Sequence, residues 1–294
     1  MTDSTNPTLA QRLFVALQHA LPQRTLSQLM YRLARVRWRP LKSLLIHSFA
    51  RLYRIDMGLA LEPSLSAYPH FNAFFTRELR PDARPLDPDP SALLCPVDGA
   101  ISQIGTIAEG RLIQAKGRDY RVQDLLGLDP NELHPFDGGR FATIYLSPSD
   151  YHRIHMPLDG DLTQMIHVPG QLFSVNGTTA DLVPGLFARN ERIVCRFDTQ
   201  AGSMGMVLVG AIFVGGMETV WAGEISPPHS GISLQRWDYP DESHHIHLER
   251  GTEMGRFNLG STVILLFPPN RIEWDPELRP GDKVRLGQRI GGLR

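Results

Sequence analysis

The stretch EMGRFNLGSTVILLF, residues 253–267, is the one around which the chain is organised. A polar turn that carries Gly255 and Gly260 is followed at once by an aliphatic, β-branched run, which is typical of a buried strand. The hydroxyl of Ser261 is therefore expected at the start of a core strand, directly after a glycine. Because Gly260 has no Cβ, its carbonyl can be approached closely and its backbone can take a strained turn.

The position of Ser261 suggests a self-cleavage reaction. If a base removes the Ser261 proton, the nearest electrophile is the carbonyl carbon of Gly260. Attack there converts the peptide bond into an ester, and β-elimination and hydrolysis then leave a pyruvoyl group in place of Ser261. Gly-Ser-Thr before a strand is also common as an ordinary turn, so the short motif alone does not decide between these interpretations.

Length and charge limit the kinds of protein to consider. The chain has 294 residues, 42% of them hydrophobic, enough for one large or two unequal domains with a substantial core. Residues 1–56 hold nine basic and two acidic residues, a net charge of +7. The whole chain has a net charge of −1, so residues 57–294 carry −8. A basic first segment suggests an anionic partner. Cys95 and Cys195 lie far apart in apolar surroundings and indicate buried thiols in a reducing compartment.

The basic first segment has the pattern of amphipathic helices. Thr8 can cap a helix that runs to Ala20, Thr25 can cap a second, and Pro40 fits the first turn of a third. Leucine and phenylalanine faces flanked by arginines suit an anionic lipid surface, although a helical cap docked on the remainder is the alternative. Nucleic-acid binding is not expected, because a binding motif and interleaved aromatics are lacking. Neither a secretory signal nor a membrane-spanning helix is expected.

The predicted fold class is α+β. From Leu93 onward, short strands are separated by glycines, and one short helix is expected near residues 122–126. We therefore expect a basic helical membrane-associating region with its linker over residues 1–86, followed by a mainly antiparallel catalytic domain over residues 87–294. The closing PGDKVRLGQ, residues 280–288, resembles the turns of lipoyl- and biotinyl-type hybrid barrels, so the body is expected to resemble a hybrid barrel or sandwich.

Candidate bases for Ser261 lie in YLSPSDYHRIHMP, residues 145–157. His152 and His155 stand three apart in a loop or single turn, and an imidazole pKa near neutrality suits proton transfer. Ordinary polar loop residues are one alternative, and a metal pair is another, although no carboxylate or cysteine set completes it. Asp98 in CPVDG, residues 95–99, is the candidate carboxylate that orients the base, unless it only forms a turn.

Further motifs follow in a recognisable order. The two stretches already quoted are accompanied by further motifs: FNAFFTREL (71–79) with a later RP, PVDG, VPGQLFSVN, LFARNER and ETVWAG. Over nearly the whole chain this order resembles the prokaryotic, pyruvoyl-dependent phosphatidylserine decarboxylase family. The resemblance implies that Asp98, His155 and Ser261 form the autoprocessing triad and that His152 serves the decarboxylation step. It also implies a substrate-side loop in which Ser174, with Phe173, binds the substrate.

The same resemblance implies a function. Cleavage between Gly260 and Ser261 would give chains 1–260 and 261–294 that stay associated, with a pyruvoyl cofactor made from Ser261 and with no metal or pyridoxal phosphate. The enzyme would be a carboxy-lyase of phospholipid biosynthesis, made as a zymogen, that converts phosphatidylserine to phosphatidylethanolamine and CO₂. It would lie peripherally on the cytoplasmic face of the cell membrane, on anionic phospholipid, with no nucleic-acid partner. A homodimer is left open.

Two features depart from the family pattern or lack a role in it. Ser149 and Asn258 stand at positions that vary in the family. The cluster of His244, His245 and His247 matches no family role, and we expect it in an exposed loop.

Three other functions remain open from the residues themselves. A serine hydrolase would use Asp98, His155 and Ser261 on external esters and would keep an intact chain. A pyruvoyl enzyme acting on a soluble amino acid would need no lipid. A non-catalytic membrane-binding or carrier module would need a modifiable lysine at a hairpin tip, and the one nearby, Lys283, has an ordinary turn setting.

Overall fold

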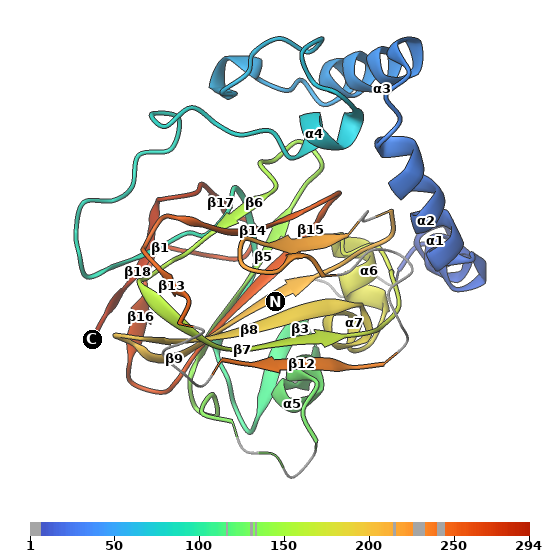
Figure 1. The fold of residues 1–294 in the computed structure, drawn as a ribbon. Coiled ribbons are helices and arrows are strands. Elements are labelled where there is room, and N and C mark those ends of the chain that lie inside the picture. Colours follow the sequence, from blue (N-terminus) through green and yellow to red (C-terminus); the bar gives the residue numbers. More distant parts are fainter. Residues whose placement is uncertain are drawn as a thin grey trace.

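A nine-stranded antiparallel sheet forms the centre of the fold (Figure 1). The computed structural model describes residues 7–115, 117–129, 132, 134–213, 216–225, 233–239 and 245–294. In sheet order the strands are β12 (Gln235–Asp238), β7 (Gly160–Val168), β8 (Arg192–Thr199), β9 (Gly202–Val209), β15 (Ser261–Phe267), β5 (Arg140–Leu146), β2 (Gly99–Thr106) and β17 (Lys283–Val284), with β13 (His247–Leu248) also paired to β7.

Other elements cover both faces of this sheet. One face packs against a four-stranded sheet and a three-stranded sheet. These are β11 (Gly223–Glu224), β10 (Met217–Thr219), β14 (Glu253–Phe257) and β6 (Arg153–His155), and β1 (Ala92–Leu94), β18 (Arg289–Leu293) and β16 (Ile272–Trp274). The other face packs against three short helices and a hairpin. These are α5 (Val122–Leu126), α6 (Gly177–Leu182), α7 (Leu186–Arg189), β3 (Arg111–Ala115) and β4 (Arg118–Arg121).

Strand β15 lies between these two layers, which explains its unbroken apolar sequence. Val263 and Leu265 face the smaller sheets, whereas Ile264 and Leu266 face the helices. Successive side chains of a strand point to opposite faces, so a strand covered on both faces needs apolar residues at every position. The core strand predicted from residues 261–267 is confirmed.

The N-terminal helices gather at one end of the sandwich (Figure 1). They are α1 (Leu9–Ala20), α2 (Gln23–Ala34), α3 (Arg39–Leu52), a 3₁₀ turn η1 (Met57–Leu59) and α4 (Phe71–Phe75), which we call the head. The head has its own apolar cluster, in which the edge of the Phe49 ring meets Phe71 with ring centroids 5.1 Å apart. Leu259, from the turn before β15, packs against the same cluster. The head core therefore continues into the turn that precedes Ser261.

Most predicted elements are confirmed. α1 begins after Thr8, whose hydroxyl accepts a hydrogen bond from the Gln11 amide in a capping box. Pro40 lies in the first turn of α3, and a helix occupies residues 122–126. The cap at Thr25 is wrong, because α2 already begins at Gln23. The Gln23 side chain bonds the Gln18 carbonyl and the Leu172 amide, which holds the start of the helix three residues earlier.

The body is a sandwich, and its described strands do not close into a barrel. The nine-stranded sheet ends at β12 on one edge and at β17 on the other. β17 has two residues and pairs with β2, after which the chain crosses to the smaller sheet and forms β18 between β1 and β16. This crossing explains why a closing segment with barrel-like turns does not complete a barrel. None of the helices in the described ranges is long and apolar enough to cross a bilayer.

Candidate active site

Two chain connections meet at one end of the sandwich. Residues 147–152 join β5 to β6, and residues 258–260 join β14 to β15. Leu146, at the end of β5, pairs with Ser261, and Arg153, at the start of β6, pairs with Arg256 of β14. Both connections therefore leave one pair of neighbouring strands and enter another pair, so they lie side by side. Strand register alone brings the loop with His152 next to the bond between residues 260 and 261.

The turn before Ser261 is strained. Its φ angles are 154° at Leu259 and 64° at Gly260, both in the region that L side chains rarely adopt. A non-glycine residue held there costs about 1–3 kcal/mol. A Cβ at Gly260 would meet no atom within 4 Å, so this position requires glycine for its backbone angle and has space around it. Strain raises the energy of the intact peptide and favours a reaction that opens it. The Ser261 side chain lies outside what the structure describes.

His155, the last residue of β6, is held in one tautomer. Its Nδ1 lies 2.8 Å from the Gly251 carbonyl oxygen, which can only accept, so Nδ1 carries the proton. Nε2 then has the lone pair, and the Tyr151 hydroxyl at 3.3 Å can donate to it. Burial lowers the pKa of His155, against the opposing effect of the Gly251 hydrogen bond. The ring is thus neutral at pH 7 with a lone pair on Nε2, as a general base requires.

His152 is fully buried, with its ring centroid 4.1 Å from that of Phe75. Its Nδ1 donates to the Asp150 carbonyl oxygen at 2.8 Å. Its Nε2 is buried and has no hydrogen-bond partner in the described part of the chain. Burial lowers the pKa of His152 to about 3, and the charge of Arg77 acts in the same direction. A buried acceptor without a partner is rare and suggests a group kept free for a ligand.

The free energy of unfolding should decrease as the pH is lowered, because of His152. Its pKa drops from an ordinary 6.5 to about 3 on folding, so between these values the unfolded chain binds more protons. This one group should therefore reduce the free energy of unfolding by about 1.4 kcal/mol between pH 7.5 and pH 5.5. In urea unfolding, the free energy of unfolding of His152→Gln should decrease between the two pH values by that much less than the free energy of the parent. Equal losses in the two proteins would contradict a buried neutral imidazole.

Asp98, just before β2, is held by Arg84. The Arg84 Nε lies 2.9 and 3.1 Å from the two carboxylate oxygens, a second guanidinium nitrogen completes the pair, and the Leu286 amide donates at 3.0 Å. The backbone places Asp98 near the base, because the His155 amide donates to the Pro96 carbonyl at 2.9 Å. The charge of Asp98 raises the His155 pKa, whereas the tautomer is set by Gly251. Orientation of His155 by Asp98 remains a prediction.

An apolar cavity of about 510 Å³ lies beside Gly260, between the head and the two connections. Its volume is in the range of small-molecule binding pockets. Its lining residues come from α2, α3, α4, both connections and the loop after β9: Met30, Leu33, Ala34, Leu44, Leu45, Ser48, Phe49, Leu52, Tyr53, Phe71, Phe75, Pro148, Ile212, Phe213, Leu259 and Gly260. The strained bond therefore borders an apolar space beneath the head.

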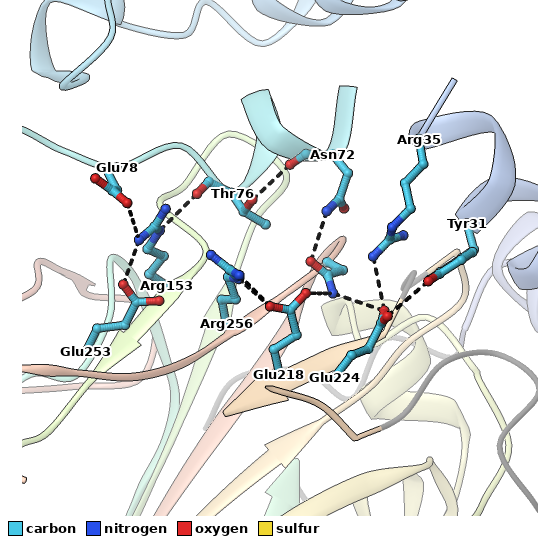
Figure 2. Close-up of polar contacts among 11 residues, drawn as sticks. Tyr31, Arg35, Asn72, Thr76, Glu78, Arg153, Glu218, Glu224, Glu253 and Arg256 are labelled. Carbon is cyan, nitrogen blue, oxygen red and sulfur yellow. Dashed lines mark hydrogen bonds and ion pairs between the residues drawn. The ribbon is translucent and has the colours of Figure 1, made fainter. Parts of the chain in front are cut away.

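Polar side chains attach the head to the strands that carry the strained turn (Figure 2). Asn72 of α4 donates to Asn258 Oδ1 at 3.0 Å, and Asn258 donates to Glu218 at 2.6 Å. Arg256 Nε donates to the same Glu218 at 2.7 Å. Asn258 is fully buried and stands two residues before Gly260, so this chain of contacts fixes the start of the turn.

Two further groups of contacts in Figure 2 hold the head on either side of this series of hydrogen bonds. Glu224 of β11 accepts from the Tyr31 hydroxyl at 2.9 Å and from Arg35 at 3.0 Å, both on α2. Arg153, next to His152, donates to the Thr76 carbonyl at 2.9 Å. It also forms ion pairs with Glu78, which follows α4, and with Glu253 of β14. The head and the loop of residues 147–152, which we call the catalytic loop after its proposed role, are therefore held in one arrangement.

The predicted substrate-side residues lie under α1. Phe173 is buried, with its ring 4.7 Å from that of His19. The Ser174 hydroxyl lies 2.7 Å from that of Thr179, and its amide donates to Gln18 at 2.7 Å. Among the described contacts, none joins Ser174 or Phe173 to His152 or His155. Their role in binding substrate stays a prediction.

The predicted histidine cluster lies at the edge of β7. His244 lies outside the described residues, whereas His245 and His247 contact the Asp161 carboxylate at 2.9 and 2.7 Å. Both histidines are exposed, and their partner is a single carboxylate. Within the described ranges, no three histidine, cysteine or acidic side chains converge as metal ligands would.

Comparison with known proteins decides the family. A family model described as Phosphatidylserine decarboxylase matches residues 71–292, and a second, described as PSD, matches residues 13–54. The chain belongs to the phosphatidylserine decarboxylase family. The family expected from the sequence motifs is thereby confirmed, and with it an enzyme of the carboxy-lyase class.

Curated relatives match this decarboxylase family member over nearly their full length. Three of them carry the name phosphatidylserine decarboxylase proenzyme. The protein of Azotobacter vinelandii is 55% identical over 284 residues, which cover 96% of this chain and 99% of the relative. That of Pseudomonas putida is 54% identical over 282 residues (96% and 98%), and that of Ectopseudomonas mendocina 54% over 286 residues (97% and 100%).

The structure adds residues to the decarboxylase site that sequence reasoning did not assign. Arg84 and Tyr151 both lie inside family-like motifs, RP and DYHR, and that membership was the available signal for them. Asn258 gave the opposite signal, because its position varies in the family. It contacts Asn72 and Glu218, which stand 186 and 40 positions away in the chain, and local sequence gives no signal of such contacts.

Proposed function

We propose that this chain is a proenzyme that cleaves itself between Gly260 and Ser261 and then decarboxylates phosphatidylserine to phosphatidylethanolamine and CO₂. One observation carries the proposal: the strained turn borders an apolar cavity and the loop with neutral His152, and strand β6, which continues from this loop, carries neutral His155. The name of the relatives supports both the substrate and the proenzyme form.

Self-cleavage begins at His155. Its Nε2 takes the Ser261 hydroxyl proton, and the serine oxygen attacks the Gly260 carbonyl carbon. His155 then gives the proton to the Ser261 nitrogen, so that the C–N bond breaks and an ester remains. Loss of the Ser261 α-proton then expels Gly260 as a carboxylate, and hydrolysis releases the Ser261 nitrogen as ammonia. The Asp98 charge favours the imidazolium that forms at His155. Strain at Leu259 is relieved as the peptide bond opens.

A pyruvoyl group at residue 261 would supply an electron sink for the electron pair left behind when CO₂ departs from the substrate. Two observations support a fit for this group: the open space around Gly260 and the unpaired Nε2 of His152. An approaching substrate carboxylate would raise the His152 pKa, since opposite charges favour each other's ionised forms. His152 can then hold a proton at Nε2 and deliver it to carbon when CO₂ has left.

The division of labour along the chain is part of the proposal. Residues 1–86 associate with an anionic phospholipid membrane, peripherally and on its cytoplasmic face, and residues 87–294 carry the chemistry. The loop with Phe173 and Ser174 lies on the substrate side, where α1 contacts it. Exposed leucines at positions 9, 13 and 17 form one stripe along α1, which supports contact with lipid.

Charged residues in this stripe should weaken membrane binding. In a Leu13→Glu/Leu17→Glu chain, two leucines that are more than half exposed lose their apolar contact and gain repulsion from anionic lipid. Affinity for vesicles containing phosphatidylglycerol should fall about 100-fold or more, as measured by co-sedimentation. Ile113→Glu, which replaces a similarly exposed residue of the body, is the control and should bind like the parent. Unchanged binding by the double variant would rule out α1 as a contact.

Intact-mass measurement under denaturing conditions tests the proposed function. Purified, active enzyme should give chains 1–260 and 261–294, the second with a carbonyl that reacts with hydrazine. A single unmodified chain that reacts with a fluorophosphonate would favour the serine hydrolase. Turnover of free serine as fast as of phosphatidylserine would favour an enzyme of soluble amino acids.

A further inference from the structure

A second cavity, of about 280 Å³, adjoins the catalytic loop. Tyr151 and Asp150 of this loop line it, whereas Pro148 of the same loop lines the apolar cavity. The segment after α4 is shared in the same way, because Phe75 lines the apolar cavity and Arg77 lines the second one. Two short chain segments therefore separate the two cavities.

Arg77 is the unusual residue of this second cavity. The residue is 6% exposed, and its buried Nε has no hydrogen-bond partner in the part of the chain that the structure describes. It lies over the Phe74 ring, 5.6 Å from the centroid. Burial lowers the pKa of Arg77, yet a guanidinium remains charged at neutral pH. A buried charge without a partner is costly, and such costs are concentrated at functional sites.

The rest of the cavity does not neutralise Arg77. Five basic and three acidic residues line it, and each carboxylate already has donors. Asp98 is held by Arg84 and the Leu286 amide, Asp56 accepts from the Gly58 amide at 2.9 Å, and Asp150 accepts from the Ser147 amide at 2.7 Å. The remaining basic residues at the rim, Arg54, Lys283 and Arg285, have no carboxylate partner among the described residues. The cavity thus has a surplus of positive charge.

We propose that this cavity binds a phosphate group through Arg77, and that in the working enzyme the phosphate is the phosphodiester of the lipid headgroup. The second half rests on the proposed function. The planar guanidinium fork matches two phosphate oxygens, which is why arginine is favoured where phosphate is recognised. A phospholipid also needs an apolar space next to its phosphate site, and the apolar cavity shares two chain segments with this one.

Thermal unfolding of the Ser261→Ala chain tests phosphate binding without any need for self-cleavage. Inorganic phosphate and glycerophosphoserine should each raise the Tm, and serine should not. Adding Arg77→Met should abolish both shifts without lowering the unliganded Tm, because it removes an unpaired buried charge. Arg77→Lys should keep part of the shift. Arg196→Met, which alters another arginine with an unpartnered Nε, is the control and should respond like the parent. No shift in the parent, or a full shift after Arg77→Met, would overturn the proposal.

Kinetics on the chain with Ser261 separates the lipid headgroup from free phosphate. Arg77→Met should raise the KM for phosphatidylserine in mixed micelles about tenfold or more while kcat changes less than about threefold, as expected for loss of a charge-assisted contact. An unchanged KM, with the phosphate shift lost, would identify a free-phosphate site and refute the headgroup assignment. Intact masses of the same samples report cleavage, so a failure of the proposed function would be seen separately from either result.

Discussion

A Ser261→Ala chain should stay a single 33.0 kDa polypeptide and should show no decarboxylase activity. Alanine lacks the hydroxyl that attacks Gly260, so neither the ester nor the pyruvoyl group can form. The backbone of residue 261 begins β15 and pairs with Leu146, and alanine can make the same backbone hydrogen bonds, so the fold should persist. A denaturing gel and an intact-mass spectrum, compared with those of the parent, measure this result.

Ser203→Ala is the matched control, because it removes a serine hydroxyl from β9 of the same sheet. It should cleave and decarboxylate like the parent. The Tm of both variants checks that they are folded. If Ser261→Ala still splits between residues 260 and 261, or keeps activity as one chain, self-cleavage by this hydroxyl is excluded.

A His152→Ala chain should cleave normally and lose decarboxylation by about 10²- to 10⁴-fold in kcat, the range usual for loss of a general acid or base. The separation is expected because we propose that His155, whose tautomer is fixed by Gly251, performs the cleavage. The unpaired Nε2 of His152 remains for the substrate. Gel analysis gives the extent of cleavage, and release of CO₂ from carboxyl-labelled phosphatidylserine gives the rate.

The opposite pattern is expected for His155→Ala, which should remain uncleaved. His245→Ala provides the control for loss of an imidazole, because His245 is exposed and contacts Asp161 away from the catalytic loop. It should match the parent in both assays. Decarboxylation at the parent rate by a cleaved His152→Ala enzyme would remove His152 from the mechanism.

Local sequence was a reliable guide where one short segment decides the structure. The capping box at Thr8, the proline that opens α3 and the unbroken apolar run of β15 each act within a few residues, and each is confirmed. The start of α2 was missed because the Gln23 side chain reaches the Leu172 amide, 149 residues away. For a similar reason, the described strands do not form the barrel that residues 280–288 suggested, since β18 pairs with β1 and β16 of the smaller sheet.

The candidate site divides in the same way. Motifs identified Asp98, His152 and His155 as candidates. The register of β5, β6, β14 and β15 places the loop with His152 beside the strained turn, whereas His155 lies in β6 and pairs with Glu253. Motifs did not identify the immediate partners. These partners make their contacts across the fold: Arg84 binds Asp98, the Gly251 carbonyl binds His155, and Asn258 lies between Asn72 and Glu218.

By itself, the sequence determined the family, the α+β class, the core strand after Ser261 and the residues able to do the chemistry, because motif order and side-chain alternation are written along the chain. The tertiary structure alone decided the protonation states and the shape of the site. A histidine pKa depends on burial and on the groups around the ring, and the apolar cavity exists because the head helices pack over Gly260. Both properties arise from residues far apart in sequence, which only folding brings together.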